Sequence, residues 1–221
     1  MRFGKPIGGL MKGLWNSPLG MAVVSSNNLG ITALALADDK EAKTCQPIDS
    51  EFAARLDAHV HNKPASIKVD IHNLPPFRQL ATAKLLEIPY GEVRSYSWLA
   101  REVGKPNAIR AVASACSNNP MPLIIPCHRV VRTDGSIGDY SLGGSENKTK
   151  ILAAEGVDLN RLKDLCTRHI RFLGDPDTKT FHVVSCRRVV EAVNVIEMRM
   201  PEEAQEKMLM PCRYCRPVHM F

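Results

Sequence analysis

The sequence predicts a mixed α/β chain in three parts: a strand-rich first part, a helical second part and a small C-terminal α+β module. Two apolar runs, 20–25 and 29–36, flank a Ser-Asn-Asn turn and predict two strands. Further on, two short capped segments joined by a turn that contains Gly104 have the helix-turn-helix signature. Near the C-terminus, a His-x3-Cys pair and a Cys-x2-Cys pair offer four ligands typical of a structural zinc site.

Length and composition limit the number of domains and the class of protein. The 221 residues, 44% of them hydrophobic, suffice for one large or two modest domains and exclude wholesale disorder. The N-terminus lacks an apolar signal region and no run reaches 18 apolar residues, so we expect a cytoplasmic protein without a membrane partner. Seven cysteines, an odd number, then indicate reduced thiols for chemistry or metal. The net charge of +6 admits a polyanionic partner or simply a basic surface.

The first part, residues 1–73, shows no catalytic constellation. Ser50 precedes Glu-Phe-Ala-Ala-Arg-Leu and predicts a capped helix. His59, His61 and His72 lie near one another, but their spacing does not fit a regular metal site. We expect them to be solvated loop histidines.

The second part, residues 74–157, begins with three predicted helices. Pro75-Pro76 opens a helix over 77–86, Ser95 caps one over 96–103 that Gly104 closes, and Asn107 caps one over 108–116. The last helix consists almost entirely of small residues. Its outer face, with Ala111 and Ser114, would let the backbone approach a widened minor groove while Arg110 enters the base stack. Close helix–helix packing is the alternative explanation.

A cysteine and a histidine follow the apolar run 122–125. Cys127 and His128 stand side by side directly after Pro126. A thiol beside an imidazole is either a nucleophile or inert packing, and these residues alone leave both readings open.

The surrounding motifs carry a resemblance. The chain resembles the methylated-DNA–protein-cysteine methyltransferase family closely over 74–157 and loosely over the strand-rich part before it. This resemblance implies an α/β domain packed on a winged-helix-like domain. It also implies irreversible, cofactor-free transfer of an alkyl group from O6 of guanine in double-stranded DNA to a cysteine of the protein. The matching motifs are Ile88-Pro-Tyr-Gly-Glu-Val-Arg-Ser-Tyr96, Ile109-Arg-Ala-Val112, Asn119-Pro120, Ile125-Pro-Cys-His-Arg-Val130, Asp134-Gly-Ser-Ile-Gly-Asp-Tyr-Ser141 and Lys148-Thr-Lys-Ile-Leu-Ala-Ala-Glu-Gly156.

The family's catalytic roles carry over to four residues. Cys127 would accept the alkyl group, His128 would take the thiol proton through a water, and Glu155 would orient and charge the histidine. Asn119 would brace the turn before the cysteine. This set suits the chemistry, because the thiolate is the attacking species and a free thiol has a pKa near 8.5. Arg129 is expected to form a structural ion pair.

The family's DNA contacts carry over in the same way. Tyr96 would crowd the phosphate 3′ of the lesion and touch the flipped guanine, and Arg110 would fill the space that the base leaves. Main-chain groups of Cys127, Val130 and Ser141, with Pro122 and Tyr140 as walls, would complete the base pocket. Taken singly, several of these residues also fit a purely structural role: Tyr96 as a packed helix residue, Glu155 as a solvated charge.

One departure from the family lies in the loop over the pocket. Leu142 separates Ser141 from the Gly143-Gly144 pair, where the family runs on directly, so the breadth of accepted alkyl groups is open.

The non-repairing relatives that bind alkylated bases replace the cysteine that this chain keeps. A damage-binding or regulatory protein remains the alternative function. A cysteine hydrolase is a weaker one, because the sequence shows no recognisable oxyanion hole. Repair by a single thiol needs only a monomer.

The third part follows a predicted linker, residues 158–169, and spans residues 170–221. A hairpin over 170–184 and a short helix over 201–208 lead to the cysteine pair. We expect zinc to be bound by His182, Cys186, Cys212 and Cys215, and to supply folding energy that so small a core lacks. Free thiols are the alternative, and the possible substitute ligands are Cys166, His169 and His219.

This module resembles the zinc domain of the bacterial adaptive-response methyltransferase. There, four cysteines bind zinc and the first accepts a methyl group from a DNA phosphotriester. His182 stands in that first position here, so phosphotriester repair does not carry over. Four arginines flank the ligands and predict either a contact with the DNA backbone or a solvated basic face; they are Arg187, Arg188, Arg213 and Arg216.

Overall fold

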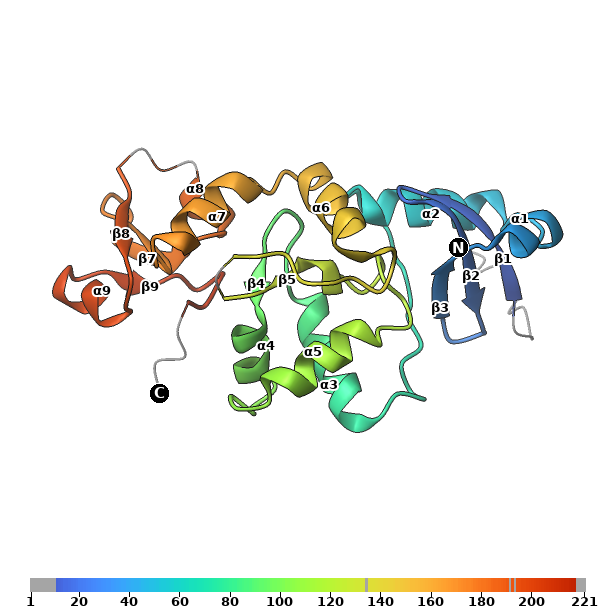
Figure 1. The fold of residues 1–221 in the computed structure, drawn as a ribbon, viewed down its shortest axis with the longest axis horizontal. Helices are drawn as coiled ribbons and strands as arrows, with labels where there is room; N and C mark the ends of the chain where they lie inside the picture. Colours follow the sequence, from blue (N-terminus) through green and yellow to red (C-terminus); the bar gives the residue numbers. More distant parts are fainter. Residues whose placement is uncertain (1–10, 134, 191, 193, 218–221) are drawn as a thin grey trace, which may run out of the picture.

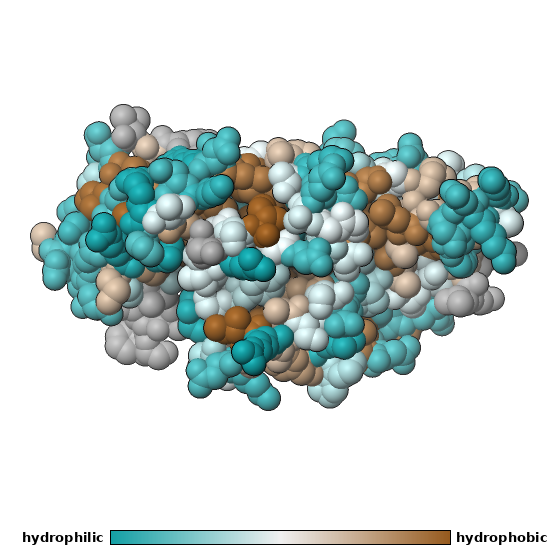
Figure 2. Space-filling view, in the orientation of Figure 1, coloured by the Kyte–Doolittle hydropathy of each residue, from teal (hydrophilic) through white to brown (hydrophobic). Residues whose placement is uncertain are grey.

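The computed structural model describes residues 11–133, 135–190, 192 and 194–217. In Figure 1 the molecule is elongated: a small sheet with two helices lies at one end, a helical unit in the middle, and a second sheet at the other end. Figure 2 shows hydrophilic residues over most of one face, with hydrophobic residues in separate small patches. Among the described residues, no helix combines the length and apolar character needed to cross a bilayer.

The first unit is a three-stranded antiparallel sheet covered by a helix. Its strands run in the order β1 (Met11–Ser17), β2 (Gly20–Ser26) and β3 (Ile31–Leu36). Two helices follow, α1 (Asp39–Thr44) and α2 (Ser50–Val60). The indole N–H of Trp15 donates to Asp57 of α2 at 2.9 Å and ties the helix to the sheet. The two predicted strands are confirmed; β1 and α1 were not predicted.

Two predicted helix caps are wrong. The side chain that caps α2 is Asp49, which accepts from the backbone N–H groups of Glu51 and Phe52, whereas Ser50 is already the first helical residue. Helix α5 (Ile109–Ser117) begins one residue later than predicted, after Ala108, with no side-chain cap. A turn in which the N–H of Ala108 donates to Lys105 O at 2.8 Å places Asn107 outside the helix.

The central unit holds the three predicted helices, and Ser95 caps the second of them as predicted. Helices α4 and α5 pack on each other and on α3, and a short parallel pair of strands, β4 and β5, lies beside them. A 3-10 turn, η1 (Cys127–Arg129), leads into β5. The elements are α3 (Pro76–Leu86), β4 (Arg94–Ser95), α4 (Tyr96–Glu102), α5 (Ile109–Ser117), β5 (Val130–Val131) and α6 (Gly144–Ala154).

One hydrophobic core runs through both of these units. Buried residues of β1 to β3 and α2 belong to the same cluster as those of α3, α4 and α5. The apolar run Met121–Ile125 lies inside this cluster, and Cys127 is at its end. Because this run and Cys127 are buried in the same cluster, the packing of the run restrains the position of the thiol.

The C-terminal module follows a helix that lies within the predicted linker. Helix α7 (Leu159–Thr167) buries Leu162 and Cys166 against the central unit and Leu165 against the module. The predicted hairpin is confirmed as the antiparallel pair β6 and β7. The sheet order is β8-β6-β7-β9, and the elements are β6 (Phe172–Asp175), β7 (Thr180–Val183), α8 (Arg187–Val190), β8 (Ile196–Met198), α9 (Glu202–Glu206) and β9 (Met210–Pro211).

Candidate active site and metal cluster

Asn119 organises the segment that carries the thiol. Its side-chain N–H group donates to Ile125 O at 2.9 Å and to Cys127 Sγ at 3.0 Å, while its Oδ1 accepts from Met121 N at 3.0 Å. Leu123, within this segment, has a φ of 72°, a left-handed conformation that residues other than glycine rarely adopt. One buried amide thus holds a strained turn and the sulfur together.

Helix α2 of the first unit also contacts the segment 119–127 that Asn119 holds. Nε2 of His59, on helix α2, donates to Ile124 O at 3.2 Å. The prediction of a solvated loop histidine is therefore wrong for His59, which is more than half buried on a helix. His61 is exposed at the C-terminal cap of α2, and the exposed ring of His72 pairs with Asp70 at 2.8 Å.

His128, which follows Cys127 directly, contacts the carboxylate of Glu155. His128 Nε2 donates to Glu155 Oε1 at 3.0 Å. Cys127 and His128 are 2% and 1% exposed, so the reaction centre is shielded from bulk water. Within the described part of the chain, Nδ1 of His128 is buried and has no hydrogen-bond partner. That nitrogen is free to accept a proton.

The carboxylate of Glu155 has three further donors. Arg129 donates to both of its oxygens at 2.8 Å, so the predicted structural ion pair is bidentate and is made with the carboxylate that His128 contacts. The N–H of Gly91 donates to Oε2 at 3.1 Å. Such charge-assisted hydrogen bonds fix the orientation of the carboxylate that His128 contacts.

Burial sets the resting protonation of these groups. It raises the pKa of Cys127, against the hydrogen bond from Asn119 and the positive charge of Lys148. It lowers the pKa of His128, against the pull of Glu155. Burial would also raise the pKa of Glu155, but the hydrogen bonds from His128 and Arg129 outweigh it and bring the value to about 2. At neutral pH the site therefore holds a neutral thiol, a neutral imidazole and an ionised carboxylate.

A buried lysine, which the sequence analysis did not single out, lies beside the site. The ammonium of Lys148, on α6, donates to Val130 O at 2.7 Å and lies 5.9 Å from the centre of the Tyr96 ring, and the whole residue is 0% exposed. A sequence signal existed: Lys148 precedes Ile151 and Leu152 by three and four residues, which places it on the apolar face of α6.

A pocket of about 450 Å³ opens onto the thiol. Cys127 forms part of its wall, together with Tyr96 from α4, Arg110 and Ser114 from α5, and Tyr140 from the loop before α6. Burial raises the pKa of Tyr96 to about 12, so its hydroxyl keeps its proton. Five of the predicted DNA and base contacts thus surround one cavity.

The other predicted contacts lie outside the residues that line this pocket. Ala111 is exposed on the neighbouring face of α5, and Ser141 is exposed beside the pocket loop. Pro122 is buried within the core run. The carbonyl of Val130 is occupied by Lys148. Leu142, the extra residue, is 3% exposed and packs into the core instead of over the cavity.

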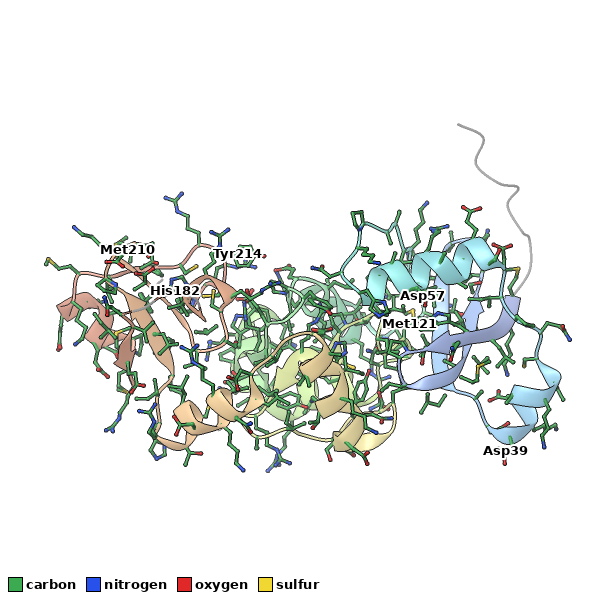
Figure 3. All side chains as sticks on the ribbon, turned by 90° about the horizontal axis from the view of Figure 1, so that it is seen from above. Asp39, Asp57, Met121, His182, Met210 and Tyr214 are labelled. Atoms are coloured by element: carbon green, nitrogen blue, oxygen red, sulfur yellow. The ribbon has the colours of Figure 1, made fainter. Side chains whose placement is uncertain are left out.

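The four predicted metal ligands meet in the C-terminal module. The ligand atoms of His182, Cys186, Cys212 and Cys215 all lie within 4.8 Å of one another, and all four residues are buried. Nδ1 of His182 lies 3.3 Å from Cys186 Sγ, while its Nε2 contacts the hydroxyl of Thr180 at 2.8 Å. Figure 3 shows His182 within this module. Three buried thiols and an imidazole that lie this close together fit the donor set of a closed zinc site.

Among the described residues, two of the alternative ligands are not part of this group. Cys166 is buried against Gly135 in a different cluster, and His169 lies in the turn after α7. His219 lies outside the described residues.

Two of the four flanking arginines are engaged within the molecule. Arg216 forms a 2.8 Å ion pair with Glu87, and Arg188 stacks over Tyr214 at 4.8 Å from the ring centre. The ion pair of Arg216 reduces the positive charge that these arginines offer to a polyanion, whereas stacking leaves the charge of Arg188 in place.

Comparison with known proteins shows which proteins the chain is similar to. Residues 76–157 match the family model "6-O-methylguanine DNA methyltransferase, DNA binding domain". The bifunctional transcriptional activator/DNA repair enzyme Ada of Escherichia coli is 37% identical over 160 residues, which is 65% of this chain and 44% of that protein. The chain therefore spans less than half of the length of Ada.

Two further relatives are matched over nearly their whole length. A methylated-DNA–protein-cysteine methyltransferase of Saccharolobus islandicus is 36% identical over 152 residues, covering 68% of this chain and 98% of that protein. The crystal structure of Mycobacterium tuberculosis OGT in complex with DNA superposes with a TM-score of 0.56 at 29% identity, over 68% of this chain and 98% of that one. The chain belongs to the methylated-DNA–protein-cysteine methyltransferase family.

Proposed function

We propose that the chain repairs DNA by transferring an alkyl group from O6 of guanine to its own Cys127, once and irreversibly. The observation that carries the proposal is the arrangement of one pocket: a buried thiol at its wall, followed by a histidine whose Nε2 is held by Glu155 and whose Nδ1 is unpartnered. This is the arrangement of a nucleophile, a base and a group that orients the base.

The reaction then runs in one displacement. The thiol proton passes through a water to Nδ1 of His128, and the ionised Glu155 stabilises the resulting imidazolium. The sulfur attacks the alkyl carbon, the bond from that carbon to O6 breaks, and its electron pair leaves with the guanine, which takes up a proton. A stable thioether remains on Cys127, so each molecule reacts once.

DNA binding is assigned to the helix pair α4 and α5. Supporting this, α5 carries small residues and the exposed Arg110 beside the pocket, and the thiol is too deep to reach a stacked base. The lesion base would be flipped into the pocket, and Arg110 would fill the gap and offset part of an unstacking cost of a few kcal/mol. The partner is double-stranded DNA that carries O6-alkylguanine.

The domain assignment follows this function. Residues 1–73 form the N-terminal α/β domain, 74–157 the winged-helix-like catalytic domain and 170–221 the zinc module, with 158–169 between them. The separate sheets of the first unit and of the module, and the helix pair beside β4 and β5, support this division, while the first two units share one hydrophobic core. Repair by one tethered thiol requires only a monomer.

Intact mass spectrometry after incubation with a duplex containing O6-methylguanine tests the proposal. The wild-type chain should gain one methyl group, and Cys127→Ala should gain none. Cys116→Ala is the matched control, because Cys116 lines the same pocket and should leave the gain unchanged. A wild-type chain that binds the duplex without gaining mass contradicts repair and favours a damage-binding protein.

We also propose that the C-terminal cluster holds one structural zinc ion. Its support is the burial and spacing of one imidazole and three thiols, a donor set suited to zinc. Bound metal would supply folding energy to a module with a small core. Metal analysis of the purified chain should give one zinc per molecule. Cys212→Ser should lose it, whereas Cys45→Ser, at a partly buried cysteine in the first unit, should keep it.

A further inference from the structure

The C-terminal module contacts the central unit through the two neighbours of a metal ligand. Ser185 and Arg187 lie on either side of Cys186. The hydroxyl of Ser185 donates to Val93 O at 2.6 Å, and the backbone N–H of Arg187 donates to Glu92 Oε1 at 3.2 Å. Metal coordination by Cys186 would therefore fix two hydrogen bonds to one short segment of the central unit.

That same segment holds the catalytic carboxylate. The N–H of Gly91 donates to Glu155 Oε2 at 3.1 Å. Gly91 has a φ of 73°, and a Cβ there would lie 2.7 Å from the main-chain O of Glu155. The side chain of Arg187 approaches this position to 3.7 Å. Gly91 is thus packed between the catalytic residue on one side and the C-terminal module on the other.

A buried charge pair makes the segment rigid. Glu92 is 0% exposed, and its Oε2 accepts from the guanidinium of Arg94 at 2.7 Å while its Oε1 accepts from Arg187 N. An unpaired buried carboxylate oxygen is costly, so Glu92 favours the position in which the module is docked.

We propose that Ser185 and Arg187 are positioning residues for alkyl transfer. Held by the metal-bound Cys186, they fix the Gly91–Val93 segment, whose Gly91 N–H aims Glu155 at His128. The inference rests on the proposed function and adds a role for the C-terminal module within it. The maximal rate of transfer then depends on a docked module, whereas the affinity for DNA, which is set by α5 and the pocket, does not.

The test uses the full-length, metal-loaded chain. Ser185→Ala removes the hydroxyl that binds Val93 and leaves all four metal ligands in place. Ser185→Thr keeps the hydroxyl, and Ser50→Ala, at the exposed start of α2, is the remote control. Single-turnover methyl transfer is measured at increasing concentrations of an O6-methylguanine duplex. Loss of one hydrogen bond should lower the maximal rate of Ser185→Ala about fivefold and leave the half-saturating concentration unchanged. Ser185→Thr should restore the rate.

Hydrogen–deuterium exchange supplies a readout that does not depend on activity. The amide of Gly91 should exchange slowly in the metal-loaded wild type and in Ser50→Ala, and faster in Ser185→Ala and in the chelated full-length chain. Equal rates and equal exchange for wild type and Ser185→Ala would overturn the inference. A wild type that gains no methyl group defeats the proposed function instead, and exchange at Gly91 then still decides whether the module holds the segment.

Discussion

Arg129 forms a bidentate ion pair with Glu155, and His128 contacts the same carboxylate. The guanidinium reaches both oxygens of Glu155 at 2.8 Å, and the imidazole reaches one of them at 3.0 Å. Arg129 therefore favours the ionised form of the carboxylate, which also accepts the hydrogen bond from His128. The two residues that follow Cys127 in the chain, His128 and Arg129, thus both contact Glu155, which is the C-terminal cap of α6.

Replacing Glu155 by Gln should slow alkyl transfer much more than DNA binding. The amide keeps the shape of the side chain but removes the charge that stabilises a protonated His128, and general-base assistance is worth about 10²–10⁴-fold. We expect the maximal single-turnover rate to fall by about 10²-fold, with the half-saturating duplex concentration within about twofold. Glu146→Gln, an exposed acid on the same helix, is the control and should react like wild type. A Glu155→Gln rate close to wild type would remove the acid from the mechanism.

The low pKa of Glu155 predicts a loss of stability in acid. The folded pKa is about 2 and the ordinary value is 4.5, so the unfolded chain binds the proton first as the pH falls. The stabilisation is fully present above about pH 4.5 and is lost toward pH 2, with a magnitude of about 3 kcal/mol. Denaturant unfolding of wild type and Glu155→Gln from pH 7 to pH 2.5 checks this. Their difference in free energy of unfolding should shrink as the pH falls, and a constant difference would contradict it.

The sequence predicted which residues carry the proposed chemistry better than it predicted the contacts that surround them. Cys127, His128 and Glu155 belong to ordered motifs, so their proximity followed from the resemblance. The contacts of Lys148 with Val130 and of His59 with Ile124 join segments far apart in the chain, and no local pattern reports them. They appear only when tertiary packing brings the segments together.

The local errors have a different cause. Asp49 and Ser50 are adjacent and both can cap a helix, so propensity does not choose between them. The turn before α5 moved Asn107 out of the capping position. The four metal ligands, by contrast, were predicted as a group because their spacing alone limits the site, and the structure brings all four together.

Replacing Asn119 by Asp should move the pH dependence of the reaction upward. Asn119 donates a hydrogen bond to Cys127 Sγ, which lowers the thiol pKa against burial. An ionised Asp cannot donate and adds a negative charge, so the thiol pKa rises and the rate–pH curve shifts to higher pH. We expect at least a tenfold slower reaction at neutral pH, as one pKa unit implies. Asn118→Asp, at the exposed neighbouring position, is the matched control, and an unshifted Asn119→Asp curve would show that the amide acts only on the backbone.

Replacing Lys148 by Met tests whether the buried ammonium assists the thiol. Its positive charge lowers the pKa of Cys127, and methionine has a similar length without the charge. The thiol pKa should rise, and the rate at neutral pH should fall about tenfold, which corresponds to one pKa unit. Stability should change little, because the cost of leaving Val130 O unpaired opposes the gain from no longer burying a charge. Lys150→Met, two residues along on the exposed side of α6, is the control. If both variants react at the wild-type rate with the same pH profile, Lys148 serves only to hold the Val130 carbonyl.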